Sequence, residues 1–266
     1  MRLAYTDEGP GPAVVLLHGF PLGRAMWKEQ VTAIGSMYRV IAPDLRGHGE
    51  SPAPDGDYTI DEMADDVIEL LDTLGLDVPV VVGGLSMGGY VALSLAERYP
   101  DRLRALLLMD TRAAADSPEA IAKREELAQA VLKAGNPGPA IEAMIPRLFS
   151  PWFVENRPEL VAPLRRVMER NSARGVIGAL RAMAARPDRT PVLARIRVPT
   201  LVLVGEEDAI TPPVELQAMA DAIPGARLEV VPRAGHLAPY ENPPVANGVI
   251  LRFLDEHPEP PPHPPS

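Results

Sequence analysis

Short apolar runs alternate with segments of helical periodicity along most of the chain. The apolar runs predict strands at residues 13–17, 39–42, 78–83, 103–109, 200–204 and 228–231, and the periodic segments predict helices at residues 26–34, 60–74 and 87–98. Strands that alternate with helices form a mostly parallel sheet with helices on both faces. The predicted fold class is therefore α/β.

This alternation breaks between residues 110 and 199. Residues 117–194 contain only helical segments, interrupted by prolines and by the turn sequence at residues 135–139. Such an insertion predicts a helical cap over an active site. We therefore expect a core of residues 1–112 and 195–256 and a cap of residues 113–194. The Pro-dominated residues 257–266 are expected to form an extended, disordered tail.

The composition disfavours several kinds of partner and of chemistry. The 266 residues include 36 acidic and 26 basic side chains, a formal net charge of -10, which disfavours nucleic acid and anionic membranes as partners. There is no cysteine, and the five histidines are scattered, so we expect no disulfide, no metal site and no cofactor. The N-terminal residues lack the apolar segment of a signal peptide, which predicts a cytoplasmic protein. Monomer and homodimer both stay open.

The sequence Gly84-Leu85-Ser86-Met87-Gly88 lies between a predicted buried strand and a predicted helix. This is the context of a nucleophile elbow, a sharp turn that exposes a serine hydroxyl above the sheet. Strand and helix approach closely at such a turn, so glycines fit where a Cβ would collide. Ser86 is the candidate nucleophile.

Two further candidates follow Ser86 in the chain, each on a loop beyond a predicted strand. A serine hydroxyl is a poor nucleophile at neutral pH and needs a base within hydrogen-bond reach. His236 is the histidine on a suitable loop, and Asp208 would orient it and balance its charge. Asp110, directly after the strand at residues 103–109, is an alternative acid.

The loop after the first apolar run has the sequence His18-Gly19-Phe20-Pro21. In this position the backbone N–H of Phe20, together with that of Met87, would stabilise an oxyanion. His18 is interpreted as a residue that shapes this loop. The sequence Asp44-Leu45-Arg46-Gly47-His48-Gly49-Glu50-Ser51 is interpreted as a loop scaffold.

These motifs together resemble the α/β-hydrolases, in the branch of esterases, 3-oxoadipate enol-lactonases and cofactor-free haloperoxidases. The resemblance covers nearly the whole chain. It includes Gly205-Glu206-Glu207-Asp208 and Gly235-His236 as well as the motifs above. It implies a mostly parallel sheet of eight strands, in which residues 103–109 form the sixth strand and the cap follows it. Epoxide hydrolases and haloalkane dehalogenases share the fold, but they have an Asp at the position of Ser86.

The predicted function is a serine carboxylic-ester hydrolase for small to medium apolar esters. The candidate pocket residues are Trp27, Met144, Phe149, Trp152, Met183 and Leu237. An enol-lactonase is an alternative, in which Arg112 would bind a substrate carboxylate. Perhydrolase or haloperoxidase chemistry would be a side reaction. A ligand receptor without turnover is a further alternative on the same fold.

Overall fold

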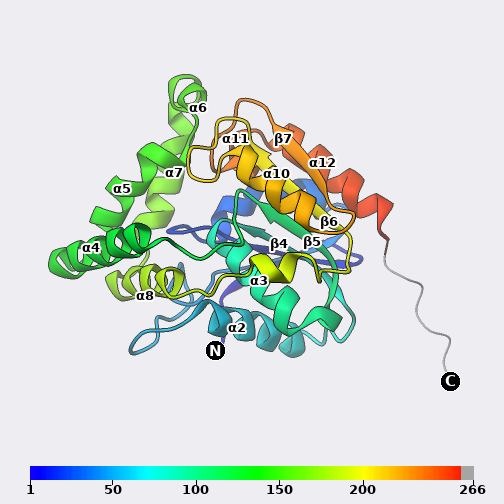
Figure 1. Ribbon diagram of the computed structural model, residues 1–266, viewed down its shortest axis with the longest axis horizontal. Coiled ribbons are helices and arrows are strands. Elements are labelled where there is room, and N and C mark those ends of the chain that lie inside the picture. The colour runs from blue at the N-terminus through cyan, green and yellow to red at the C-terminus, as the bar shows by residue number, and fades with distance from the viewer. Residues whose placement is uncertain (259–266) are drawn as a thin grey trace.

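The computed structural model describes residues 1–258 and has a central sheet of strands in the order β1-β3-β2-β4-β5-β6-β7 (Figure 1). Only β1 runs antiparallel to its neighbour, β3. The strands are β1 (Tyr5–Glu8), β2 (Ala13–Leu17), β3 (Arg39–Pro43), β4 (Val80–Leu85), β5 (Leu103–Met109), β6 (Thr200–Gly205) and β7 (Arg227–Val231). The predicted α/β class is confirmed.

The expected number of eight strands is wrong, because residues 1–258 form seven. Before β2 the chain makes a single edge strand, β1, whose sequence Tyr-Thr-Asp-Glu has no apolar run and was not predicted. The helical insertion consequently follows the fifth strand of this sheet, β5, and not the sixth.

Side chains of successive strand residues point to opposite faces of the sheet, and two hydrophobic cores result. In β4, Val80 and Val82 belong to one core and Val81 to the other. The first core is covered by α2 (Ile60–Thr73), α3 (Met87–Arg98) and α10 (Pro213–Ala222). The second is covered by the 3-10 helix η1 (Arg24–Trp27), α1 (Lys28–Ile34) and α12 (Pro243–Glu256).

The remaining helices are mostly those of the insertion. Residues 110–199, here called the helical insertion, contain α4 (Pro118–Ala134), α5 (Gly138–Leu148), α6 (Pro151–Asn156), α7 (Pro158–Glu169), α8 (Ala173–Ala184) and the short α9 (Thr190–Leu193). Helices α4 to α8 stand together beside the sheet (Figure 1). Two short helices, η2 (Pro100–Arg102) and α11 (Ala238–Glu241), complete the described part. The division into core and cap at residues 112/113 and 194/195 stays a prediction, and most of the expected tail lies beyond the described residues.

The two chain segments that connect the insertion to the sheet are held together by a buried ion pair. Arg186, on the outgoing segment, lies 2.8 Å from Asp116 on the incoming segment, and both side chains are almost fully buried. The same guanidinium donates to the carbonyl oxygen of Ala114 at 2.9 Å and lies over the ring of Tyr90 on α3 at 4.1 Å. Because Tyr90 belongs to the helix that follows Ser86, the insertion is attached next to the turn that carries Ser86.

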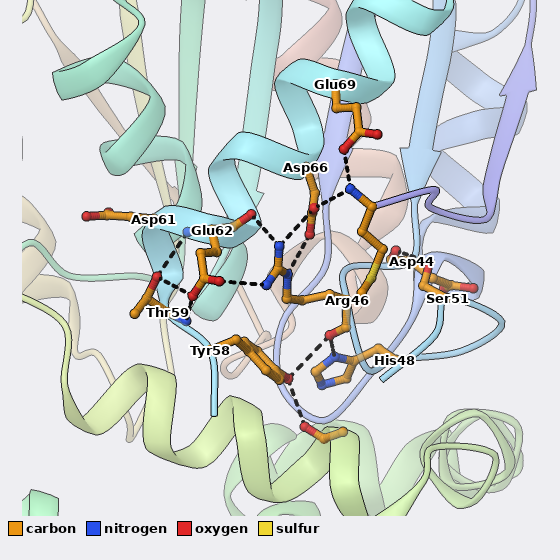
Figure 2. Close-up of polar contacts among 12 residues, drawn as sticks. Asp44, Arg46, His48, Ser51, Tyr58, Thr59, Asp61, Glu62, Asp66 and Glu69 are labelled. Atoms are coloured by element: carbon orange, nitrogen blue, oxygen red, sulfur yellow. Dashed lines mark hydrogen bonds and ion pairs between the residues drawn. The ribbon is translucent and has the colours of Figure 1, made fainter. Parts of the chain in front are cut away.

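A second attachment involves the loop of residues 44–51 (Figure 2). Arg46 donates two hydrogen bonds to Asp66 on α2, at 2.6 and 2.9 Å. The hydroxyl of Tyr58 donates to the carbonyl oxygen of Gly175 on α8 at 2.8 Å and lies 3.3 Å from that of Arg46. The loop is therefore fixed between a helix of the sheet layer and a helix of the insertion, which agrees with its predicted scaffold role.

The turn between β4 and α3 brings backbone segments into close contact at the sheet. Ser86 has a φ of 53° and a ψ of -113°, a strained conformation for a residue with a side chain. A Cβ on Gly84 would overlap the backbone of Gly88, and a Cβ on Gly88 would overlap the carbonyl group of Leu17 in β2. The glycines thus allow α3 to start directly against two strands.

This packing predicts a large stability loss for Gly84→Ala. The methyl group meets only backbone, which cannot move aside, so we expect the free energy of unfolding to fall by about 1–3 kcal/mol or more in urea denaturation. Gly248→Ala is the matched control, because Gly248 lies inside α12 with nothing within 4 Å of the added methyl. This control should gain up to ~1 kcal/mol from helix propensity. Equal stabilities of the two variants would contradict the packing argument.

Candidate active site

Three side chains from three separate loops form one chain of hydrogen bonds. The Oγ of Ser86 lies 2.8 Å from Nε2 of His236, and Nδ1 of His236 lies 2.8 Å from Oδ2 of Asp208. His236 and Asp208 are buried, while Ser86 is partly exposed. With Asp208 ionised, Nδ1–H donates to the carboxylate and Nε2 accepts from the serine hydroxyl. The three residues predicted from sequence therefore lie together in the geometry that activates a nucleophile.

Backbone and hydroxyl donors of its own loop hold Asp208 in place. Its Oδ1 accepts from the amides of Ile210 at 2.8 Å and Thr211 at 3.0 Å, and its Oδ2 accepts from the hydroxyl of Thr211 at 2.6 Å. Burial opposes ionisation of this carboxyl, but the hydrogen bond and charge of His236 and the hydrogen bonds from Thr211 together outweigh burial, so the pKa of Asp208 is lowered. A carboxylate is the form that can accept from Nδ1–H.

Asp110, the alternative acid, has different partners. Its Oδ1 accepts from the amide of Gly205 at 2.8 Å and its Oδ2 from that of Ala238 at 3.2 Å. The side chain therefore links the end of β6 to the segment that follows His236. Burial and the charge of Asp208 raise the pKa of Asp110 well above its usual range. Asp208, and not Asp110, hydrogen-bonds to His236.

The raised pKa of Asp110 predicts a pH-dependent effect of Asp110→Asn. As the pH rises above about 4, the native state keeps a proton on Asp110 that the unfolded chain releases, so wild-type stability falls relative to the variant. The difference levels off above the raised pKa, where both states are ionised. Urea unfolding of both proteins between pH 4 and pH 9 measures it. The same substitution at the exposed Asp77 is the control. A pH-independent difference for Asp110→Asn would refute this assignment.

Glu241, which was not predicted from the sequence, hydrogen-bonds to the loop of His236. Its Oε1 accepts from the amides of Gly235 at 2.9 Å and Leu237 at 3.3 Å, on either side of His236. Its Oε2 accepts from the amide of Ser150 in the insertion at 2.8 Å. Burial raises the pKa of Glu241, while these amides favour its anion. The proximity of Glu241 to His236 in the sequence was the available signal, but the amide of Ser150 lies 91 residues away and left none.

The two residues predicted to supply oxyanion donors, Phe20 and Met87, belong to segments next to Ser86. Met87 is the first residue of α3, so its amide is one of the helix N–H groups without an acceptor inside the helix. Phe20 follows Gly19, whose added Cβ would lie 3.4 Å from Cβ of Ser86. Both amides thus belong to segments that touch Ser86. Their role as donors stays a prediction.

His18 has the structural contacts expected of it. Its Nε2 accepts from the amide of Leu45 at 2.9 Å, and its Nδ1 lies 2.9 Å from the carbonyl oxygen of Gly19. This pattern fits a neutral ring with the proton on Nδ1. Burial lowers the pKa of His18. The ring therefore connects the loop of Phe20 to the loop of residues 44–51.

The predicted pocket residues divide into two groups. Leu237 follows His236 directly, and the backbone of Phe149 and Ser150 packs against Gly235, so Leu237 and Phe149 lie beside the histidine loop. The others are placed as follows: Trp27 and Met183 are buried in the two cores, Met144 is partly buried against both, and Trp152 is half-buried under the guanidinium of Arg233 at 5.1 Å. The assignment of a pocket to these six residues stays a prediction.

Arg112 has partners of its own. Its guanidinium lies 3.2 Å from the carboxylate of Glu215 on α10 and donates to the carbonyl oxygen of Ile210. Ile210 is two residues beyond Asp208. The observed partners of Arg112 thus come from the acid loop and α10.

Neither a metal centre nor a membrane segment is found in residues 1–258. No group of three or more His, Asp or Glu side chains in this range is arranged to hold a metal ion. Within the same range, every helix is too short or too polar to span a bilayer. The cytoplasmic location stays a prediction.

A sheet of this strand order, with a serine on a sharp turn between strand and helix, is the arrangement of the α/β-hydrolase class. The chain matches the model of the alpha/beta hydrolase fold over residues 12–243 and belongs to that family. It is an enzyme of the α/β-hydrolase superfamily, and the resemblance inferred from the motifs is confirmed.

Similar proteins include esterases and enol-lactonases. The chain is 47% identical to a thermophilic esterase from Thermogutta terrifontis, solved with malate bound, with a TM-score of 0.94 over 96% of this chain and 94% of that one. It is 33% identical to a 3-oxoadipate enol-lactonase of Acinetobacter baylyi over 94% of this chain and 91% of the relative. The solved enol-lactonase from Burkholderia xenovorans has 33% identity and a TM-score of 0.88, covering 95% of this chain and 96% of that one.

Proposed function

We propose that the chain is a serine hydrolase of carboxylic esters, with Ser86, His236 and Asp208 as the catalytic residues. The observation that carries this proposal is the continuous hydrogen-bonded chain from Ser86 to Asp208, 2.8 Å at each step, which ends at a partly exposed hydroxyl. Such a chain activates a hydroxyl that meets substrate and shields the base and acid from solvent.

Each step of the reaction uses a group already described. Nε2 of His236 takes the proton of Ser86 while Oγ bonds to the acyl carbon, and the carbonyl oxygen becomes an oxyanion. The amides of Phe20 and Met87 stabilise this oxyanion. The intermediate collapses as His236 returns the proton to the departing alcohol. Water, deprotonated by the same histidine, then attacks the acyl-serine and releases the acid and Ser86.

The proposed substrates are small to medium apolar esters. The buried apolar residues Phe149 and Leu237 belong to segments beside the histidine loop, which supports an apolar substrate, and the similarity to the esterase from Thermogutta terrifontis supports an ester. Lactones are the second candidate, favoured by the similarity to two enol-lactonases. A lactone is a cyclic ester, so the same nucleophile, base and oxyanion donors would open it. Attack of peroxide on the acyl-serine would give a perhydrolase side reaction.

The first test is steady-state hydrolysis of p-nitrophenyl esters from acetate to decanoate, with an enol-lactone in the same panel. We expect rapid turnover of the short esters and a loss of about 10⁴-fold or more in kcat for Ser86→Ala. The control is Ser36→Ala, which removes the hydroxyl of an exposed serine outside the proposed site and should keep wild-type rates. A fluorophosphonate should label Ser86, as peptide mass spectrometry would show.

The other outcomes decide between the alternatives. Turnover of the lactone alone would replace the esterase by a lactonase. One equivalent of product per protein without further turnover would support a receptor. Ester turnover that survives Ser86→Ala would contradict the proposed nucleophile.

A separate variant tests how a lactone with a carboxylate would bind. Because Glu215 and the carbonyl of Ile210 engage Arg112, we expect Arg112→Ala to change KM for an anionic enol-lactone by no more than about twofold. A neutral lactone of equal size is the control substrate. An increase of KM of about tenfold for the anionic lactone alone would show that Arg112 binds the substrate carboxylate.

A further inference from the structure

A buried asparagine of the insertion bonds directly to the loop that carries Phe20. Asn171 lies between α7 and α8 and is 3% exposed. Its Nδ2 donates to the carbonyl oxygen of Pro21 at 2.7 Å and lies 3.4 Å from that of Leu22. Its Oδ1 accepts from the amide of Gly49 at 2.7 Å. One side chain of the insertion therefore bonds to two loops of the sheet domain.

The partners allow only one orientation of the side-chain amide of Asn171. Two carbonyl oxygens need donors, and the amide of Gly49 needs an acceptor, so Nδ2 and Oδ1 cannot be exchanged. Leaving either bond unmade would be unfavourable, because no solvent replaces it at a buried site. The orientation of the side chain, and with it the position of both loops, is thus fixed.

The loop held by Asn171 is a closed turn next to the nucleophile. The amide of Leu22 donates to the carbonyl oxygen of Gly19 at 2.9 Å, which closes the turn around Phe20. Gly19 packs against Ser86 at one end of this turn, and Asn171 bonds to Pro21 and Leu22 at the other. A shift of the second half of the turn therefore moves the amide of Phe20 relative to Ser86.

The segment that carries Asn171 packs closely against the loops of the sheet domain at both of its ends. At the start of α8, an added Cβ on Gly175 would overlap the backbone of Gly47. At the end of α7, Val167 lies within 3.5 Å of a Cβ built on Gly23. The hydroxyl of Ser172 accepts from the amide of Gly175 at 3.0 Å and caps α8. These contacts hold the backbone on both sides of Asn171 in a fixed position.

We propose that Asn171 is a positioning residue that holds the turn of Gly19–Leu22 in the geometry needed for oxyanion stabilisation. The insertion is then a part of the catalytic apparatus, in addition to any contact it makes with substrate. This inference rests on the proposed function, because it assigns a purpose to the amide of Phe20. It applies to the transition state more than to substrate binding, since the oxyanion exists only after attack by Ser86.

The test compares Asn171→Ala and Asn171→Asp with the control Asn136→Asp. Asn171→Asp keeps the acceptor for Gly49 but loses the donors to Pro21 and Leu22. Asn136 is an exposed asparagine of the insertion that donates to the carbonyl of Ala134 and accepts from Gly138, so it undergoes the same change away from the turn. Three quantities are measured for each: kcat and KM for p-nitrophenyl butyrate, Ki for butylboronic acid, and amide hydrogen exchange of residues 19–23.

For both Asn171 variants we expect kcat to fall about 10- to 100-fold, less than the ~100- to 1000-fold loss from deleting an oxyanion donor. KM should stay within about threefold of wild type. Ki for the boronic acid, whose tetrahedral adduct on Ser86 places an oxygen at the oxyanion position, should weaken in parallel with kcat. Hydrogen exchange at residues 19–23 should accelerate, and Asn136→Asp should match wild type in every respect.

Unchanged kcat and boronate Ki in folded Asn171 variants would overturn the inference, as would a fall confined to KM. If both Asn171 variants fail to fold, the residue maintains the fold in general and the inference is overturned as well. A failure of the proposed function is a different result: wild-type protein would neither hydrolyse esters nor react with the boronic acid. In that case faster exchange at residues 19–23 would still show that Asn171 positions the turn.

Discussion

The candidate active site depends on one close approach between backbone segments. At Gly84 and Gly88 the helix α3 rests directly on β4 and on the end of β2, and Ser86 is forced to a φ of 53°. Gly88 also touches the carbonyl of His18, at the start of the loop that carries Phe20. One packing contact therefore fixes the position of Ser86, the proposed nucleophile, relative to the loop of Phe20 and the start of α3. A larger side chain at either glycine would separate these parts at once.

Buried carboxyl groups connect the loops that surround this contact. Asp208 bonds to amides of its own loop, Asp110 joins the end of β6 to the segment after His236, and Glu241 joins the histidine loop to the insertion. Their acceptor oxygens are used mainly on backbone N–H groups, which fixes main-chain positions without a demand on neighbouring side chains. The cost of this arrangement is desolvation: burial raises the pKa of Asp110 and of Glu241, and the charge of Asp208 raises the pKa of Asp110 further.

The features that could be predicted are those set by residues close together in the sequence. Local periodicity and turn residues determine most strand positions and the turn around Ser86, so these could be predicted. The same local signals gave the chain order of Ser86, Asp208 and His236. The strand β1 could not, since its polar residues are stabilised by pairing with β3. Glu241 and Asn171 were missed for a related reason: the amides and carbonyls that they bind lie up to 150 residues away. An isolated Asn or Glu in the sequence carries no sign of such partners.

The attachment of the insertion also has an evolutionary meaning. The insertion leaves the sheet after β5 and returns at β6, which are neighbouring strands, and Arg186 and Asp116 clasp its two ends together. Because its two ends are adjacent and joined to each other, such a segment can be exchanged for another of different length without a change in the hydrogen-bonding register of the sheet. The side chain of Asn171 and the amide of Ser150 are the points at which the present insertion bonds to the loops of Phe20 and His236. A replacement insertion would have to supply counterparts of these two small polar groups to hold both loops as they are here.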